Sequence, residues 1–152
     1  MQYAYIREGS FRELFTDPAF DLMAAAYTSE SGTAEYGEAN VAKEGYYTLE
    51  KYGDASLLVV ESCDCIVGFA VIVHSYHMHF SKHIAVLETL YLDPVFRNGT
   101  LGIKLIRAAQ KFAKQKGFEF MTASAPAGSR LNKLYARMGR ATDVDYLFKL
   151  GD

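Results

Sequence analysis

The chain has 152 residues and a mass of 17.0 kDa, which fits one domain, because domains usually contain about 100–200 residues. Half of the residues are hydrophobic and 22% are charged, a globular composition that excludes a largely disordered protein. We therefore expect residues 1–152 to form a single domain.

Three further features bear on where the protein resides. The apolar runs are shorter than the roughly 18–20 residues that span a bilayer, and the N-terminus carries charged residues in place of a signal-peptide core. Cys63 and Cys65 are the only cysteines, which excludes a disulfide framework and leaves them a structural role. We expect a cytoplasmic protein.

The net charge of −2 conceals two regions of opposite sign. Residues 1–96 contain five Lys or Arg against fourteen Asp or Glu, whereas residues 97–140 contain ten Lys or Arg against one acid, Glu119. A basic block this dense in an acidic protein favours one localised anionic partner over a general affinity for nucleic acid. The alternative is a solvated helix face that happens to be basic.

The first half of the chain predicts a strand, two helices and a β-hairpin. Thr16-Asp17-Pro18 indicates a helix start, because a capping side chain precedes a proline in the first turn. The apolar face of that helix is expected to hold Phe20, Leu22, Met23, Ala26 and Tyr27. The expected elements are a strand at 2–7, this helix, a helix at 38–52 that ends before Gly53, and strands at 57–60 and 66–75.

The second half predicts alternating strands and helices. Apolar residues at helical spacing from Leu101 to Phe112 indicate a long helix, and Ser129 can cap another. Alternating apolar residues indicate a last, half-buried strand. The expected elements are strands at 84–92, 118–123 and 142–150 and helices at 100–116 and 129–138. The whole order is β-α-α-β-β-β-α-β-α-β.

The segment from Leu90 to Gly117 is the most informative. A buried strand runs into a loop with Gly99 and Gly102, and the loop opens directly into a basic helix. Loop amides and a helix N-terminus together attract a phosphate or pyrophosphate. The counter-charges available are Arg97, Lys104 and Arg107. Neither the P-loop motif nor the dinucleotide fingerprint is present.

The loop sequence Arg97-Asn98-Gly99-Thr100-Leu101-Gly102 resembles the [Q/R]-x-x-G-x-[G/A] motif of the Gcn5-related N-acetyltransferase (GNAT) superfamily. Thr100 stands in place of the middle glycine, and Gly99 lies one position early. This shifted form, with His77-Met78-His79-Phe80 upstream, is similar to small acetyltransferases of bacteriophages and prophages. The resemblance covers about residues 57–150.

The resemblance implies an α+β, three-layer fold, with helices on both faces of a central mixed, largely antiparallel sheet. It also implies acetyl-CoA as co-substrate and no metal. Main-chain groups of the strand before the loop would pair with the pantetheine arm, and the loop amides would bind the pyrophosphate. The family also has an N-x-x-Y-x-x-x-G pattern on its last helix, which Asn132, Tyr135 and Gly139 match. The cofactor-binding residues implied are Leu90, Tyr91, Leu92, Arg97, Asn98, Gly99, Thr100, Leu101, Gly102, Ile103 and Asn132.

Two catalytic residues are expected. Tyr135 is the candidate general acid for the departing thiolate, the alternative being a tyrosine of the core. Glu88 lies in the middle of an apolar strand, where a carboxylate is costly unless it faces water or a partner. It is the candidate general base, directly or through water, and a structural carboxylate is the alternative.

The expected function is direct acetyl transfer to a primary amine in a ternary complex. The acceptor is a small-molecule amine, or the lysine or N-terminal amine of a protein. Glutamates of the predicted helical region (Glu30, Glu35, Glu38 and Glu44) favour a cationic acceptor. The alternative is that these acids only keep the surface soluble. A homodimer is possible, and neither nucleic acid nor a membrane is an expected partner. A non-catalytic CoA-binding or protein-interaction module on the same fold is the alternative.

Overall fold

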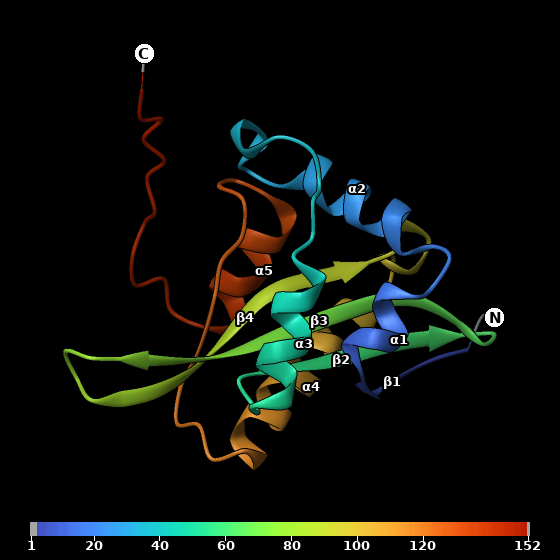
Figure 1. The fold of residues 1–152 in the computed structure, drawn as a ribbon, viewed down its shortest axis with the longest axis horizontal. Coiled ribbons are helices and arrows are strands. Elements are labelled where there is room, and N and C mark those ends of the chain that lie inside the picture. Colours follow the sequence, from blue (N-terminus) through green and yellow to red (C-terminus); the bar gives the residue numbers. More distant parts are fainter. Residues whose placement is uncertain (1–2, 152) are drawn as a thin grey trace.

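The computed structural model describes residues 3–151 and contains a five-stranded sheet with helices on both faces (Figure 1). In chain order the elements are β1 (Ala4–Gly9), α1 (Phe11–Phe15), α2 (Phe20–Glu30), η1 (Ala34–Tyr36), α3 (Lys43–Lys51), β2 (Ala55–Ser62), β3 (Cys65–His77), β4 (Lys82–Leu92), η2 (Pro94–Phe96), α4 (Leu101–Gln115), β5 (Met121–Ala123) and α5 (Arg130–Met138). None of the helices in residues 3–151 is long and apolar enough to cross a membrane.

The strands are ordered β1-β2-β3-β4-β5 across the sheet. Neighbours are antiparallel except for β4 and β5, which are parallel and pair only at Ala85–Leu87 with Met121–Ala123. This mixed, largely antiparallel sheet between helical layers confirms the expected fold class.

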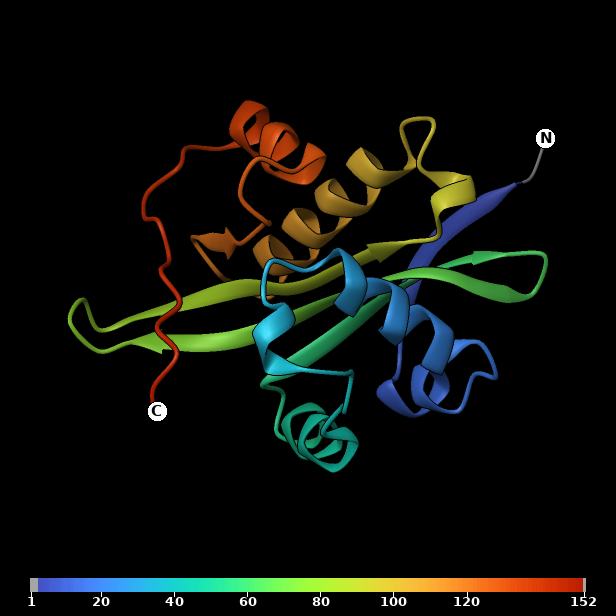
Figure 2. The ribbon, with the colours of Figure 1, turned by 90° about the horizontal axis from the view of Figure 1, so that it is seen from above.

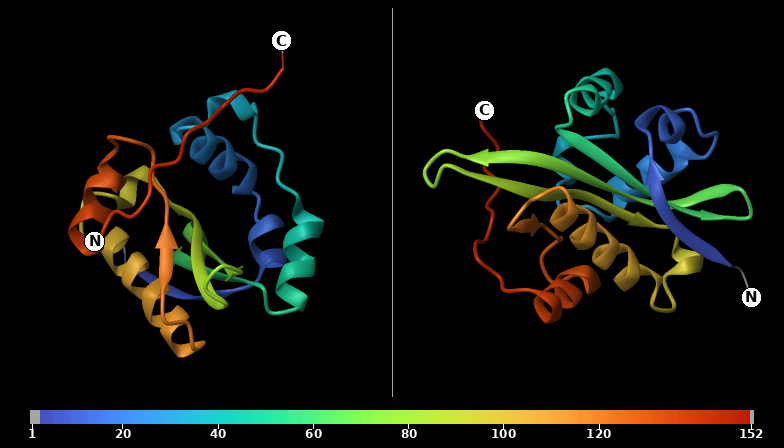
Figure 3. Two further views of the ribbon diagram at one scale, coloured as in Figure 1. Left: turned by 90° about the vertical axis from the view of Figure 1, so that its left-hand side faces the viewer. Right: turned by 90° about the horizontal axis from the view of Figure 1, so that it is seen from below.

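Two hydrophobic clusters hold the layers together, one on each face of the sheet. Alternation along β2 divides its side chains, so that Leu57 and Val59 pack under α1, α2 and α3, while Leu58 and Val60 pack against α4. Figures 2 and 3 show the sheet between these two sets of helices. Both helical layers are therefore packed against the sheet, which fixes the positions of their side chains.

The first helix is one that the sequence interpretation missed. Ser10 and Glu13 form a capping box, in which the Ser10 side chain accepts from the Glu13 amide, and α1 begins at Phe11. The helix expected from Thr16 instead begins at Phe20, because Asp17 accepts a hydrogen bond from the Ala19 amide and holds a turn there. Of the expected apolar face, Leu22 is exposed.

The boundaries of other elements also differ from expectation. The helix expected at 38–52 is shorter and begins at Lys43, after η1 and an irregular segment. The strand expected at 118–123 pairs only from Met121. The first strand begins at Ala4, and the expected start at Gln2 lies outside the described residues.

The strand expected at 142–150 is absent from the structure. Residues 140–151 contain no helix or strand, and their side chains are exposed. The apolar residues do alternate along this segment, but no described strand lies beside it to pair with it. The expectation of a half-buried strand is therefore wrong.

Candidate active site

The site is built around a β-bulge in β4. Val71 and Ile72 of β3 pair with Thr89 and Leu87, so Glu88 is an extra residue on β4 without a partner. The bulge lies directly after the last residue of β4 that pairs with β5. Glu88 is solvent-exposed, which removes the cost of burying its carboxylate.

Beyond the bulge, β4 has one unpaired edge. The Asp93 amide donates to the Val67 carbonyl of β3, and main-chain directions alternate along an antiparallel pair. The main-chain groups of Leu90 and Leu92 therefore face the open edge, whereas those of Tyr91 face β3. Of the three residues expected to pair with pantetheine, Leu90 presents its amide and carbonyl on the required side, whereas Leu92 presents only its amide, because its carbonyl accepts from Arg97.

The open edge leads to the N-terminus of α4, which has no side-chain cap. Thr100 occupies the N-cap position without a capping hydrogen bond, and Lys104 is the first residue whose amide donates within the turn, to the Thr100 carbonyl. The preceding amides therefore remain available to a ligand. A Cβ placed on Gly99 or Gly102 would meet no atom within 4 Å, so both glycines border open space.

Arg97 lies at this loop, but its charge is already compensated. Its guanidinium makes a 3.0 Å ion pair with Glu30 at the end of α2, and its Nε donates to the Leu92 carbonyl at 2.6 Å. It also lies over the Tyr91 ring, 5.7 Å from the centroid. The other two expected counter-charges, Lys104 and Arg107, are exposed on α4.

Glu88 has a partner that sequence reasoning missed. The Tyr46 hydroxyl on α3 donates to both carboxylate oxygens of Glu88, at 2.9 and 3.1 Å. The Tyr46 ring is fixed by stacking on Phe11, with centroids 5.1 Å apart. Burial, followed by the charge and hydrogen bond of Glu88, raises the pKa of Tyr46, so its hydroxyl remains a donor. The two residues are 42 positions apart, and no local signal connects them.

Tyr135 lies on α5 and packs at the edge of the cluster under α4. Burial raises the pKa of Tyr135 to about 12, and nearby Tyr27 contributes to the rise. Tyr27 on α2 also contributes to the raised pKa of Tyr46. The structure thus joins Glu88 to Tyr46 by a hydrogen bond, and it places Tyr135 in the cluster on the α4 side of the sheet.

Asn132, the last of the expected residues, and the histidines of the β3–β4 hairpin remain to be placed. Asn132 is on the first turn of α5, capped by Ser129, and its side chain is exposed. His74 lies on the β3–β4 hairpin, with Nε2 2.6 Å from Nδ1 of His83 and its ring against Phe118. Among the described residues, no three His, Cys, Asp or Glu side chains converge as metal ligands.

Solved structures with the same fold cover almost the whole chain. Ribosomal-protein-alanine N-acetyltransferase from Brucella melitensis biovar Abortus 2308 has a TM-score of 0.68 at 16% identity, over 97% of this chain and 100% of the other. Glucosamine-6-phosphate N-acetyltransferase from Arabidopsis thaliana has a TM-score of 0.70 at 18% identity, over 99% of each chain. Aminoglycoside N-acetyltransferase AAC(6')-Iy, solved in complex with CoA, has a TM-score of 0.72 at 15% identity, over 99% of this chain and 96% of the other.

At these identities the structural likeness concerns the fold, and no curated protein matches the chain. The sequence profile of the Acetyltransferase (GNAT) family, however, matches residues 12–139. That range extends from α1 to the end of α5 and includes the open edge of β4, the loop before α4, and the residues Tyr46, Glu88 and Tyr135. The chain belongs to the acetyltransferase (GNAT) family.

Proposed function

We propose that the protein is an acetyl-CoA-dependent N-acetyltransferase that moves an acetyl group directly to a primary amine. The observation that carries this proposal is the continuous path from Glu88, along the unpaired edge of β4, to the uncapped N-terminus of α4. A pantetheine arm needs extended main-chain partners, and a pyrophosphate needs converging amides. Both are present and adjoin a carboxylate.

The residues fit acetyl-CoA in three respects. Leu90 and the amide of Leu92 offer main-chain groups to the pantetheine arm, and Gly99 and Gly102 leave room for phosphate oxygens close to the backbone. Lys104 and Arg107 supply exposed positive charge on α4. Since Arg97 is paired with Glu30, its main role in this proposal is to tie the loop to α2. The relative AAC(6')-Iy, which was solved with CoA, supports this choice of ligand.

The roles of the catalytic side chains follow from their surroundings. Acetyl-CoA, when bound, supplies the thioester carbonyl that the amine attacks. Glu88 accepts a proton from the attacking amine, directly or through water, because it is exposed and held by Tyr46. Tyr135 donates a proton to the departing thiolate, and its raised pKa keeps the phenol protonated at neutral pH. Both substrates are bound at once, and no covalent enzyme intermediate is needed.

The experiment that tests the function has two stages. Acetyl-CoA should raise the melting temperature of the protein in a thermal-shift assay, and the protein should then release thiol in the presence of a suitable amine. Acetyl-CoA binding without thiol release across small amines, polyamines, aminoglycosides and lysine peptides would favour the non-catalytic module. Absence of binding would contradict the proposal.

We predict that Tyr46→Phe lowers kcat about tenfold, which is the scale of one hydrogen bond to a charged group. The ring keeps its stacking on Phe11, but the Glu88 carboxylate loses its donor. The KM for acetyl-CoA should change little.

Tyr47→Phe is the matched control for this prediction. Tyr47 is the next residue on α3 and packs on Phe15, 5.7 Å away between ring centroids. No hydrogen bond to its hydroxyl is found in the described part of the chain. A kcat that is the same in Tyr46→Phe and in wild type would show that Tyr46 only supports the fold.

We further propose that the amine acceptor is cationic. A groove of about 330 Å³ between α2 and the 31–40 segment is lined by Tyr27, Tyr36 and Glu38. It adjoins a larger groove of about 770 Å³ that contains Asp21 and again Glu38. Of the two grooves, only the smaller one includes Tyr27. Of the glutamates that suggested an acidic cleft, Glu30 is neutralised by Arg97, whereas Glu38 remains to attract a cation.

We predict that Glu38→Gln raises the KM of a cationic acceptor several-fold at low salt, on the scale of one exposed charge pair. The difference should shrink at high salt, because exposed charges are screened beyond about 8 Å at physiological ionic strength. Glu35→Gln is the control, since Glu35 is exposed on the same segment but lines neither groove. Equal effects of the two variants, or a preference for an anionic acceptor, would contradict this assignment.

A further inference from the structure

Two histidines of the β3–β4 hairpin point ring nitrogens at each other. His74 on β3 and His83 on β4 are diagonal neighbours on one face of the hairpin, because Tyr76 is the direct partner of His83. Nε2 of His74 lies 2.6 Å from Nδ1 of His83. At this separation the two nitrogens share one proton, since two N–H groups or two bare lone pairs would repel each other. The lone pairs of both nitrogens therefore converge on one point.

A carboxylate lies behind the first of these two rings. Oδ1 of Asp54, immediately before β2, is 3.4 Å from Nδ1 of His74, and the His74 amide donates to the Asp54 carbonyl at 2.8 Å. The carboxylate favours the tautomer of His74 that carries its proton on Nδ1, which leaves the lone pair on Nε2. A carboxylate in this position is the usual support of a metal-ligating histidine, because it orients the ring and makes the other nitrogen a better ligand.

Aromatic neighbours hold the two imidazoles and leave the pair open to water. The ring of His74 packs against Phe118, with centroids 4.9 Å apart, and the ring of His83 packs against Tyr76, at 4.8 Å. His83 is exposed, and the side chain of His74 is 29% exposed. Water can therefore complete the coordination of an ion that the two rings hold.

We propose that His74 and His83 bind a divalent transition-metal ion in the place of their shared proton. Zn²⁺, Ni²⁺ and Cu²⁺ accept imidazole nitrogen readily, whereas Mg²⁺ and Ca²⁺ prefer oxygen. Tetrahedral Zn²⁺ with Zn–N bonds of about 2.0–2.1 Å sets two nitrogens about 3.3 Å apart, so the rings need to separate by only about 0.7 Å. No third His, Cys, Asp or Glu side chain converges here within residues 3–151, so water supplies the other ligands.

This metal site is separate from the proposed acetyl-transfer site. Alternation along β4 places His83 on the same face as Ala85 and Leu87, which pack on the α4 side of the sheet. Glu88 is instead hydrogen-bonded to α3, on the opposite side. A bound ion links β3 to β4 and, through Asp54, to the start of β2, so it should raise the melting temperature of the protein. The inference does not depend on the proposed catalytic roles.

Zinc titration of the untagged full chain by calorimetry tests the site. The background is Cys63→Ser with Cys65→Ser, so that no thiolate competes for the ion. We expect one Zn²⁺ per chain, tighter binding of Cu²⁺ than of Zn²⁺, and no binding of Mg²⁺. His83→Gln should abolish zinc binding, because one of the two ligands is lost. Asp54→Asn should weaken it about tenfold, the scale of one carboxylate behind a ligating histidine.

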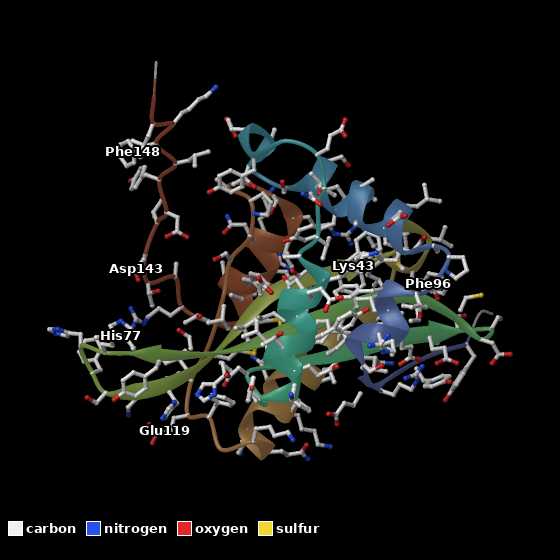
Figure 4. The ribbon with its side chains drawn as sticks, viewed as in Figure 1. Lys43, His77, Phe96, Glu119, Asp143 and Phe148 are labelled. Atoms are coloured by element: carbon white, nitrogen blue, oxygen red, sulfur yellow. The ribbon has the colours of Figure 1, made fainter. Side chains whose placement is uncertain are left out.

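His77→Gln with His79→Gln is the matched control. These histidines belong to the same hairpin but pack on Phe80, and Figure 4 shows His77 at the outer end of the hairpin. This control should bind Zn²⁺ as tightly as the background protein. In ¹⁵N spectra of the imidazoles, zinc should shift Nε2 of His74 and Nδ1 of His83. Absence of zinc binding, or binding that His83→Gln keeps or the control loses, would overturn the proposal.

Discussion

Gly102→Asp should weaken acetyl-CoA binding by at least about 100-fold while the protein remains folded. The substitution places a carboxylate at the first turn of α4, where the pyrophosphate is proposed to bind, and contact between like charges costs several kcal/mol. The fold should survive because a Cβ at Gly102 meets no atom within 4 Å. An acidic residue in the first turn also stabilises a helix.

The measurement is acetyl-CoA affinity by calorimetry, together with the melting temperature of the unliganded protein. Gln110→Asp is the control, since it adds the same charge to an exposed position two turns further along α4. Gly102→Ala separates bulk from charge and should have a smaller effect. A folded Gly102→Asp protein with unchanged affinity would place the pyrophosphate elsewhere.

Tyr135→Phe should lower kcat by about 10²–10⁴, the usual contribution of one general acid. The ring remains in the cluster under α4, so packing is kept, and only the hydroxyl is lost. Since burial raises the pKa of Tyr135 to about 12, the phenol is protonated throughout the working range. The ratio of wild-type to variant rates should therefore be constant between about pH 6 and pH 10.

Single-turnover kinetics should accompany this experiment, because product release can hide a change in the chemical step. The KM for acetyl-CoA and the melting temperature should stay close to wild type. A kcat within about threefold of wild type, measured where chemistry limits the rate, would show that Tyr135 is a core residue and not the general acid.

The fold class and the glycine-containing loop before α4 could be predicted because their signals are local. The spacing from Leu101 to Phe112 determines which face of α4 is buried, and the two glycines before it mark the loop. Local signals also compete, and α1 shows the consequence. Ser10 and Glu13 form a capping box that is visible in the sequence, but Thr16-Asp17-Pro18 offered a second start signal nearby. Tertiary packing of Phe11 and Leu14 favours the first.

The candidate site could be predicted only in part, because half of it depends on contacts between distant segments. Sequence spacing gives no sign of three features of the site. These are the hydrogen bond from Tyr46 to Glu88, the bulge that leaves Glu88 without a partner on β3, and the ion pair of Arg97 with Glu30. The segment 142–150 illustrates a different limit. Alternation of apolar residues predicts a strand there, but it does not tell whether another strand lies beside the segment to pair with it.

The order of the strands has a consequence for how the domain assembles. β2, β3 and β4 are consecutive in the chain and adjacent in the sheet, so two hairpins can form early from contacts between nearby residues. β5 can join only after α4 has crossed the sheet, and its ladder is three residues long. The face that is proposed to hold acetyl-CoA, between β4 and α4, is therefore completed late. Strands β2, β3 and β4 would form the more stable folding unit, and α4 with β5 the less stable one. The ligand would bind where these two units meet.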